Sequence, residues 1–234
     1  MGRRESAPVL GPLVLERLMH YYHLVAEQIE ERPHGRVSSA EIAHLLGMDD
    51  TLVRKDLAAI GVRGRPRVGF STAELMEAVR ITLGFNDTYK AVIVGAGRMG
   101  GAIASYAGFA KYGLYVVALF DVDAERVGNV QGGVFVQPLE NLETVIARHD
   151  VRLAILTVPA DAAQALADRM VASGIRAIWN FAPTSLVVPP GVFVRHEHIS
   201  IGLGELAYFL KQYRGAEARE AAAEGSESNS GTSS

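Results

Sequence analysis

The sequence KAVIVGAGRMGGAIASYAGFAKYGLYVVALFD, residues 90–121, decides the fold of this chain. It begins with an apolar, β-branched run at 91–94, which is typical of a buried parallel strand. The glycine-rich turn Gly95–Gly100 comes next, and a segment of helical character follows it to about Lys111. A second apolar run at 115–120 predicts another strand. The stretch therefore predicts a strand–helix–strand unit of an α/β domain.

The turn carries the pattern G-x-G-x-x-G between a predicted strand and a predicted helix. Gly95 permits the tight turn, Gly97 lets a pyrophosphate approach the backbone, and Gly100 lets the helix pack on the strand. Asp121, at the end of the next strand, suits hydrogen bonds from the adenosine ribose and repels a 2′-phosphate. These features predict NAD(H) binding, and the alternative is a nucleotide-free or CoA-binding Rossmann relative. The residues predicted to bind from this stretch are Gly95, Ala96, Gly97, Arg98, Met99, Gly100, Asp121 and Val122.

Composition limits the classes of protein that this chain can belong to. The 234 residues are 49% apolar and 21% charged, as in a globular protein with a real core. There is no cysteine, which excludes disulfides, thiolate metal sites and thiol redox sensing. No apolar run reaches membrane-spanning length and the N-terminus lacks a signal-peptide pattern, so we expect a cytoplasmic protein without a membrane partner.

The N-terminal third has the outline of a helix-turn-helix domain. Apolar residues recur at helical spacing over 12–31, and the capping box Ser38–Glu41 predicts a short helix that stops at Gly47. A third helix is predicted over 51–60, where Asp49 or its neighbour caps the start. Its inward positions are apolar. Its outward positions are Thr51, Arg54, Lys55 and Ala58.

A basic segment follows this third helix. Between Arg54 and Arg67 there are five basic residues and one acidic residue, although the net charge of the chain is −3. The segment is rich in glycine and proline where a winged-helix fold has its wing, and its R-G-R-P-R run resembles the AT-hook core. Arginines of this kind suit a narrow A·T-rich minor groove. The alternative is a solvated, arginine-rich turn. The predicted DNA-binding residues are Thr51, Arg54, Lys55, Ala58, Arg63, Arg65 and Arg67.

The remainder alternates strands and helices, which predicts a doubly wound parallel sheet of the Rossmann type. Strands are predicted at 152–158 and 175–181, and an alanine-rich helix at 160–173 lies between them. Ligand groups gather at the carboxyl ends of such strands. This adds Thr157, Val158, Pro159, Asn180, Phe181 and Ala182 to the predicted cofactor-binding residues.

These patterns predict four segments. Residues 1–84 form a winged-helix DNA-binding domain, and 85–201 form a Rossmann NAD(H)-binding domain. Residues 202–214 form a last helix without a partner inside the sheet domain, so we expect it to pack against another protomer. Residues 215–234 form a disordered tail. No substrate domain, metal motif or nucleophile motif is evident, so the sequence indicates a sensor rather than an enzyme.

Several of these motifs, in this order, resemble the Rex family of redox-sensing transcriptional repressors over nearly all of residues 12–213. The matching motifs include Val53-Arg54-Lys55-Asp56-Leu57, Gly61-x-x-Gly64, Val68-Gly69-Phe70, the glycine-rich turn, Tyr106-Ala107-Gly108-Phe109, Phe120-Asp121-Val122-Asp123, Thr157-Val158-Pro159, Asn180-Phe181-Ala182-Pro183 and Leu206-Ala207-Tyr208-Phe209-Leu210. The resemblance implies a homodimeric repressor that binds a palindromic operator when NAD⁺-bound or ligand-free and that NADH releases. It also implies a last helix swapped between subunits, and Tyr106 and Phe109 beside the nicotinamide.

The chain departs from the family pattern at the wing and at a polar switch. Arg67 stands where the family has a wing glycine, and Leu52 and Ile60 also differ, so we infer a shifted operator preference. His23 stands where the family usually has an arginine, and Ser200 where it has an aspartate that pairs with that arginine and with the tyrosine matching Tyr106. Two alternatives therefore remain. One is a winged-helix regulator whose ligand response is lost or changed, and the other is an NAD-dependent dehydrogenase.

Overall fold

The computed structural model describes residues 10–31 and 35–229, which fall into two compact units. The first unit comprises Met1–Thr88 and Ala107–Tyr115, and the second comprises Tyr89–Tyr106 and Val116–Ser234. The far ends of the predicted first domain and of the predicted tail lie outside the described residues. The return of the chain into the first unit at 107–115 was not predicted.

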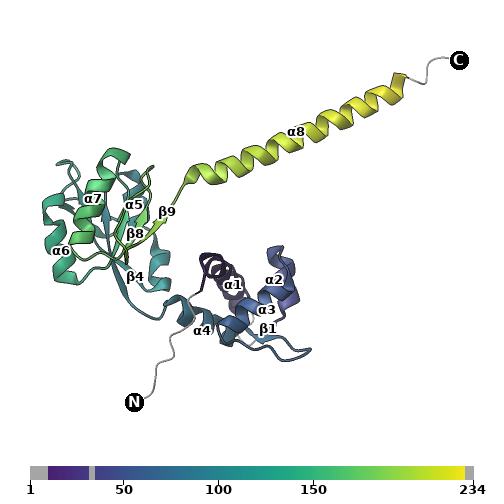
Figure 1. The fold of residues 1–234 in the computed structure, drawn as a ribbon, viewed down its shortest axis with the longest axis horizontal. Coiled ribbons are helices and arrows are strands. Elements are labelled where there is room, and N and C mark those ends of the chain that lie inside the picture. The colour runs from purple at the N-terminus through teal and green to yellow at the C-terminus, as the bar shows by residue number, and fades with distance from the viewer. Residues whose placement is uncertain (1–9, 32–34, 230–234) are drawn as a thin grey trace. The chain divides into compact units, whose positions relative to one another are not determined.

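The first unit contains four α-helices and a small antiparallel sheet (Figure 1). Its elements are α1 (Pro12–Glu31), β1 (Arg36–Val37), α2 (Ser39–Leu46), α3 (Asp50–Ala59), β2 (Phe70–Ser71), α4 (Thr72–Leu83) and the 3₁₀ helix η1 (Ala107–Tyr112). Ser38 caps α2 through its Oγ, which accepts from the Glu41 backbone N–H at 3.0 Å, and Gly47 ends α2 with a left-handed φ of +64°. Asp49 caps α3. The local signals therefore placed these helices correctly.

One apolar core holds the first unit together. Each α-helix contributes one buried stripe to this core. The buried residues recur every three or four positions, which is the pattern expected for amphipathic helices. The buried residues include Leu18, Tyr21, Val25, Ile42, Val53, Leu57, Phe70, Leu75 and Val79.

The second unit is built on a seven-stranded sheet in the order β5-β6-β4-β3-β7-β8-β9. The strands are β3 (Tyr89–Val94), β4 (Leu114–Asp121), β5 (Val130–Gln131), β6 (Val134–Pro138), β7 (Leu153–Leu156), β8 (Ala177–Asn180) and β9 (Phe193–His196). β3 pairs in parallel with β7, β4 with β6, and β8 with both β7 and β9. The prediction of a parallel, doubly wound sheet is thus confirmed, except that the edge strand β5 is antiparallel to β6. The order of the strands reverses between β3 and β7, and ligands of such sheets bind at that point.

Helices cover both faces of this sheet. Val92 and Val94 point toward α6 (Leu142–His149) and α7 (Ala160–Ala172), whereas Ile93 points to the opposite face beside α5 (Arg98–Ala104). Figure 1 shows α6 and α7 together on one side of the sheet. Because both faces are buried, the central strands are continuously apolar, as the sequence indicated.

Two helices differ in length from their predictions. The helix after the glycine-rich turn ends at Ala104 rather than near Lys111, and η1 follows in the first unit. The Ser105 hydroxyl at the end of the helix donates to the Gly101 carbonyl at 2.7 Å. The last helix, α8, runs over Ile199–Asn229, well beyond the predicted 202–214 and into the predicted tail. Its extension contains the run 216–224 of alanine, glutamate and arginine, which are strong helix formers.

The first part of α8 exposes apolar side chains, with Leu206 and Phe209 each 64% exposed. Its packing against a second protomer stays a prediction. Within residues 10–31 and 35–229, no helix is long and apolar enough to cross a membrane.

Candidate functional site

The conformation of the glycine-rich turn requires glycine at two of its three pattern positions. Gly95 has a φ of +103°, and a Cβ there would lie 2.6 Å from the Thr157 carbonyl oxygen. A Cβ on Gly100 would collide with the Gly95 carbonyl oxygen. In contrast, no atom lies within 4 Å of the position of a Cβ on Gly97, so a ligand can approach the backbone there. Each glycine therefore has the surroundings that its predicted role requires.

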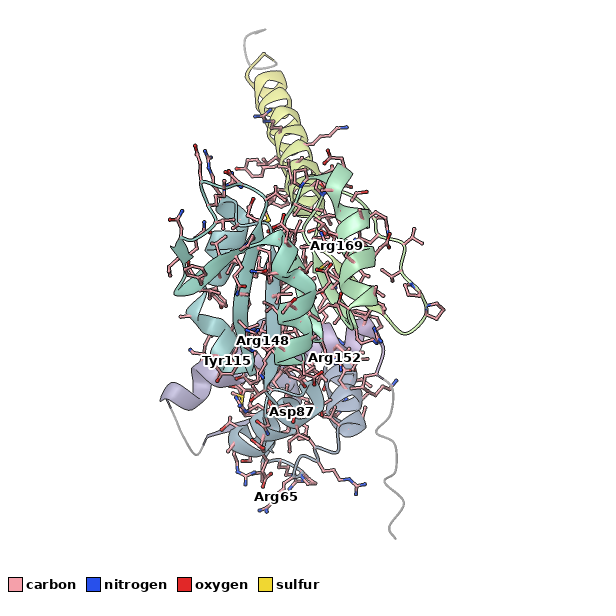
Figure 2. All side chains as sticks on the ribbon, turned by 90° about the vertical axis from the view of Figure 1, so that its left-hand side faces the viewer. Arg65, Asp87, Tyr115, Arg148, Arg152 and Arg169 are labelled. Carbon is pink, nitrogen blue, oxygen red and sulfur yellow. The ribbon has the colours of Figure 1, made fainter. Side chains whose placement is uncertain are left out.

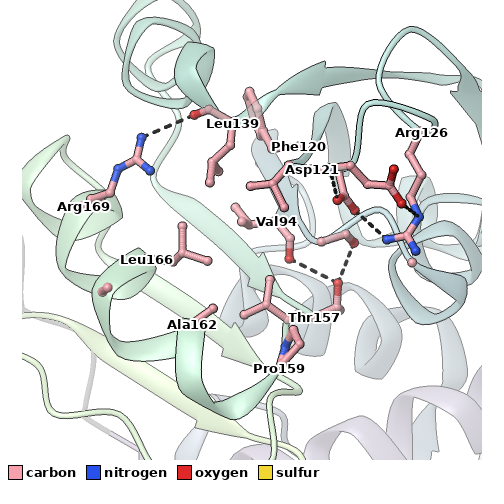
Figure 3. A pocket seen from close by; sticks show the side chains of 16 residues that line it. Val94, Phe120, Asp121, Arg126, Leu139, Thr157, Pro159, Ala162, Leu166 and Arg169 are labelled. Atoms are coloured by element: carbon pink, nitrogen blue, oxygen red, sulfur yellow. Dashed lines mark hydrogen bonds and ion pairs between the residues drawn. The ribbon is translucent and has the colours of Figure 1, made fainter.

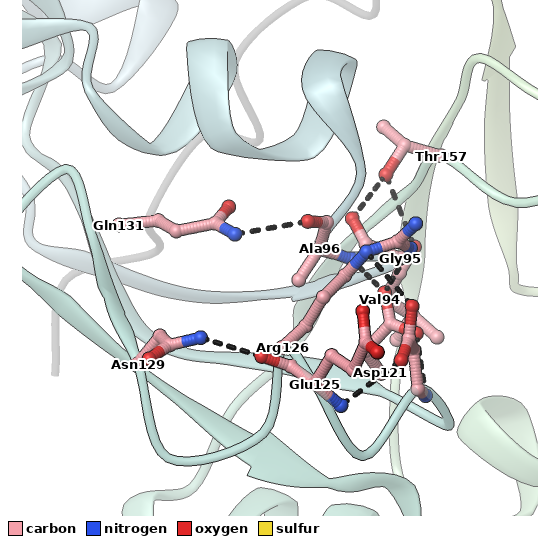
Figure 4. Close-up of polar contacts among 10 residues, drawn as sticks. Val94, Gly95, Ala96, Asp121, Glu125, Arg126, Asn129, Gln131 and Thr157 are labelled. Carbon is pink, nitrogen blue, oxygen red and sulfur yellow. Dashed lines mark hydrogen bonds and ion pairs between the residues drawn. The ribbon is translucent and has the colours of Figure 1, made fainter.

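Three side chains from three strand ends hold the turn in place (Figure 4). Asp121 Oδ2 accepts from the Ala96 N–H at 2.7 Å, and Gln131 Nε2 donates to the Ala96 carbonyl at 3.0 Å. Thr157 Oγ1 donates to the Gly95 carbonyl at 2.8 Å. The loop is thus fixed before any ligand binds, which lowers the entropy cost of binding.

Asp121 is only 8% exposed and is charged at neutral pH. Burial alone would raise its pKa. Hydrogen bonds from the backbone N–H groups of Asp123 and Ala96, together with Arg126, outweigh burial and hold the pKa of Asp121 below its ordinary value. Arg126 Nη1 lies 3.1 Å from Asp121 Oδ2. The carboxylate therefore both anchors the loop and faces the cavity beside it.

A cavity of about 570 Å³ opens next to this loop (Figure 3). Its walls are largely apolar and include Val94, Phe120, Leu139, Ala162 and Leu166. Its polar rim contains Asp121, Arg126 and Arg169. An apolar cavity beside a carboxylate suits the adenine and ribose of a nucleotide, and the open backbone at Gly97 suits the pyrophosphate.

A second, shallower hollow of about 500 Å³ also lies against Gly97. It is polar, and its lining includes Arg98, Ser105, Arg126 and Gln131. Gly97 and Arg126 line both spaces, so the glycine-rich loop forms a bridge between them.

The structure brings most of the predicted cofactor residues together, but not all of them. Those that line one of the two spaces are Gly95, Ala96, Gly97, Arg98, Asp121, Val122, Thr157, Val158 and Pro159. Those that line neither space are Met99, Gly100, Tyr106, Phe109, Asn180, Phe181 and Ala182.

Asn180 shows why some predicted residues lie outside these spaces. Its side chain is buried and ties the chain after β8, because Nδ2 donates to the Thr184 carbonyl at 2.8 Å and Oδ1 accepts from the Ala182 N–H at 3.0 Å. Phe109 lies on η1, which belongs to the first unit.

Sequence reasoning missed Arg126, Gln131, Leu139 and Arg169. Arg169, on α7, pairs with Glu143 at 2.8 Å and donates to the Leu139 carbonyl at 3.4 Å, which places it at the edge of the cavity. Nothing in the local sequence marks Gln131, Leu139 or Arg169. An arginine soon after the strand-end aspartate was the one available signal.

Five arginines of the first unit line a groove of about 770 Å³ between α2, α3 and the loop after α3. Its lining includes the predicted DNA-binding residues Arg54, Ala58, Arg63, Arg65 and Arg67, together with Arg36. Arg65 extends from the loop into solvent (Figure 2). Thr51 and Lys55 lie on α3 outside this groove. Arg54 pairs with Asp50 one turn before it at 2.6 Å.

A buried ion pair fixes α3 against α1. Asp56 is 4% exposed and accepts from Arg17 at 2.6 and 2.8 Å and from the Tyr21 hydroxyl at 2.9 Å. Burial would raise the pKa of Asp56, but these hydrogen bonds and the charge of Arg17 hold it below its ordinary value. The one acidic residue of the basic segment is therefore neutralised inside the unit, and it does not offset the charge of Lys55 or of the wing arginines.

Curated relatives match along most of the chain. The redox-sensing transcriptional repressor Rex of Pelotomaculum thermopropionicum is 40% identical over 191 residues, which are 82% of this chain and 90% of that protein. Rex of Carboxydothermus hydrogenoformans is 38% identical over 191 residues, 82% of this chain and 92% of that protein. The chain belongs to the Rex family.

Matches to family descriptions and solved structures agree with this assignment. Residues 86–184 match "CoA binding domain" and residues 12–58 match "Putative DNA-binding protein N-terminus". The Rex-family repressor RSP in complex with NAD⁺ and operator DNA is 33% identical with a TM-score of 0.82, covering 92% of this chain and 98% of RSP. RSP in complex with NADH gives the same identity and TM-score over 90% and 99% of the two chains. The curated relatives are named as repressors and not as enzymes, so the chain is a regulator.

The wing of this Rex protein carries an unusual residue. Arg67 has a left-handed φ of +62°, a region in which a non-glycine residue costs about 1–2 kcal/mol. Glycine adopts this left-handed conformation without that cost. Here a positive charge stands at the tip of the wing in spite of the strain.

The predicted switch residues lie in different units. His23, on α1, contacts the rings of Tyr22 and Tyr112 edge-on, at centroid distances of 5.8 and 6.3 Å. Ser200 lies in the first turn of α8, and Tyr106 follows α5 and is 55% exposed. The joint action of these three residues stays a prediction.

Proposed function

We propose that this chain is a homodimeric winged-helix repressor that binds a palindromic, A·T-rich operator and that NADH releases from it. The observation that carries this proposal is the fixed glycine-rich loop. Asp121, Gln131 and Thr157 hold it beside an apolar cavity, in the same chain as a groove lined by five predicted DNA-binding residues. Operator DNA, NAD⁺ and NADH are the ligands of the related repressor RSP.

The residues of the cavity have separable tasks. The apolar walls would hold adenine, Asp121 the ribose, and the backbone at Gly97 the pyrophosphate. NAD(H) itself supplies the redox signal, since its nicotinamide carries a positive charge only when oxidised. A protein surface that is apolar around this ring favours the neutral form, because an unpaired charge is costly to bury.

Exposed apolar side chains support the proposed dimer, and exposed basic side chains support the proposed DNA contacts. Leu206 and Phe209 of α8 expose apolar area that a second copy would cover. Arg54, Lys55 and the wing arginines would contact phosphates and the minor groove. We place this activity in the cytoplasm, where the operator lies.

The test is operator binding at fixed salt, with a palindromic probe selected from random DNA and titrated with NADH and separately with NAD⁺. We expect NADH to release the DNA at concentrations where NAD⁺ has little effect. Arg65→Ala should weaken binding and reduce the salt dependence by about one unit of log–log slope. Arg148→Ala, on α6 of the second unit, removes the same charge and should leave both quantities unchanged.

A second function is favoured by His23 and Ser200, which replace the two partners of the charged pair that the Rex pattern carries. A neutral pair is weaker than a charge-assisted one. Tight operator binding that ignores both nucleotides would establish a winged-helix regulator with a lost or changed response.

A further inference from the structure

Arg126 lies at the centre of a charge cluster on the rim of the cavity. Its Nη1 is 3.1 Å from Asp121 Oδ2, and its Nε is 3.3 Å from Asp123 Oδ2. Two carboxylates therefore share one guanidinium. The Arg126 side chain remains 45% exposed, so its positive charge also faces solvent and any ligand.

The position of Arg126 connects this cluster to the nucleotide. Arg126 lines both the apolar cavity and the polar hollow, and so does Gly97. Figure 4 shows its guanidinium beside the Asp121 carboxylate. A ribose that reaches Asp121 must consequently lie within the field of Arg126.

The hydrogen bonds of Asp121 limit what this carboxylate can do alone. Its Oδ2 accepts from Ala96 N–H and Arg126, and its Oδ1 accepts from the Asp123 N–H at 2.9 Å. In dinucleotide sites an acidic residue selects the ribose 2′-hydroxyl, whereas a nearby arginine accommodates a 2′-phosphate. This site contains both, and they are paired.

We propose that Arg126 is a specificity-determining residue of the dinucleotide site, which lowers the discrimination of the site against the ribose 2′-phosphate of NADP(H). The proposal rests on the proposed NAD(H) site and adds a residue that its glycine pattern does not contain. It also changes the expectation drawn from Asp121 alone. Without Arg126, two carboxylates would face the phosphate without a counter-charge, and NADP(H) would be excluded far more strongly.

The experiment is calorimetric titration of the full chain with NADH and, separately, with NADPH, in the unaltered protein and in Arg126→Gln. We expect the ratio of the two dissociation constants, NADPH over NADH, to rise by about tenfold or more in Arg126→Gln, since a like charge opposes the phosphate. Arg126→Lys keeps the charge and should stay within about threefold of the unaltered ratio. The increase should shrink as salt rises from about 0.05 M to about 0.5 M, because the cluster is partly exposed.

Arg152→Gln is the matched control. Arg152 also pairs with an aspartate, Asp150, at 2.6 Å, and it lines neither space of the nucleotide site. The ratio of the NADPH and NADH dissociation constants in Arg152→Gln should equal that of the unaltered chain. An unchanged ratio in Arg126→Gln would overturn the proposal, because Arg126 would then have no effect on the choice of nucleotide. Joint loss of both nucleotides would also overturn it, because Arg126 would then support the site as a whole. If the unaltered chain binds neither nucleotide, the proposed NAD(H) site is wrong, and the proposal for Arg126 fails with it. If the unaltered chain binds NADH but the ratio does not change in Arg126→Gln, only the proposal for Arg126 fails.

Discussion

The wing and the glycine-rich turn are both tight loops that would meet phosphates, yet they are held in opposite ways. The tip of the wing is closed by its own backbone, since Arg65 and Gly69 exchange two hydrogen bonds at 3.0 Å. The glycine-rich turn is instead fixed by side chains from three distant strand ends. We therefore expect the tip of the wing to adjust to the DNA more readily than the glycine-rich turn adjusts to its ligand.

The two loops also differ in where charge and strain lie. The wing accepts a left-handed arginine at Arg67, which costs stability but adds a charge. The glycine-rich turn has a glycine, Gly95, at its left-handed position. The charge beside it belongs to Asp121, whose carboxylate accepts from the Ala96 N–H of the turn. Strain is therefore tolerated where the loop is solvent-exposed, and it is avoided where the loop is packed.

The largest expected effect comes from adding a Cβ to the packed loop. Gly95→Ala should lower the free energy of unfolding by about 3 kcal/mol, because backbone strain and overpacking each cost roughly 1–3 kcal/mol. Urea unfolding followed by circular dichroism measures this loss.

Gly97→Ala is the control for that substitution. Its Cβ has open space and its φ of −71° is ordinary, so stability should change by less than about 0.5 kcal/mol. NADH affinity should nevertheless fall, since the methyl group would meet the pyrophosphate. Equal destabilisation by the two variants would contradict the view that packing, rather than glycine content, fixes this loop.

An intermediate effect is expected from the charge of Asp121. Asp121→Asn should cost about 2 kcal/mol at pH 7, because hydrogen bonds to a charged group contribute about 1.5–3 kcal/mol. The pKa of Asp121 is lowered in the folded state, so its contribution is present above the unfolded pKa of about 3.9 and is lost as pH falls through the folded pKa. The difference between the unaltered chain and Asp121→Asn should therefore be constant from about pH 7 to about pH 5 and shrink below about pH 4.

Asp150→Asn provides the comparison for this pH series. The Asp150 side chain is 78% exposed, and such ion pairs contribute about 0–1 kcal/mol.

Operator binding by the ligand-free Asp121→Asn protein should equal that of the unaltered chain, since the wing is closed by its own backbone. Weakened DNA binding in that variant would show that the two loops are not independent.

The smallest expected effect is at the tip of the wing. Arg67→Gly should raise the free energy of unfolding by about 0.5 kcal/mol, because relief of left-handed strain slightly exceeds the added flexibility of glycine in the unfolded chain. The same variant should bind the operator more weakly, and its log–log salt slope should fall by about one. A loss of stability would indicate that the Arg67 side chain supports the wing.

Local patterns predicted the parts of the molecule whose causes are local. The capping residues Ser38 and Asp49, the stop at Gly47 and the glycine-rich turn were all found from short-range signals, and the structure confirms them. Alternating strands and helices likewise predicted the doubly wound sheet. The premature end of α5 was missed, because the chain from 107 to 115 packs in the first unit, and the helical pattern carries no trace of that packing.

The sequence by itself determined the two kinds of unit, the position of the nucleotide loop and the basic face of the first unit, since propensity, spacing and turn chemistry act between near neighbours. The tertiary structure alone decided which side chains complete the sites. Gln131 reaches Ala96 from the β5–β6 hairpin, and Arg17 neutralises Asp56 from another helix. These contacts depend on how distant segments pack, and a hydrogen bond across the fold leaves no periodic mark on the residues that form it.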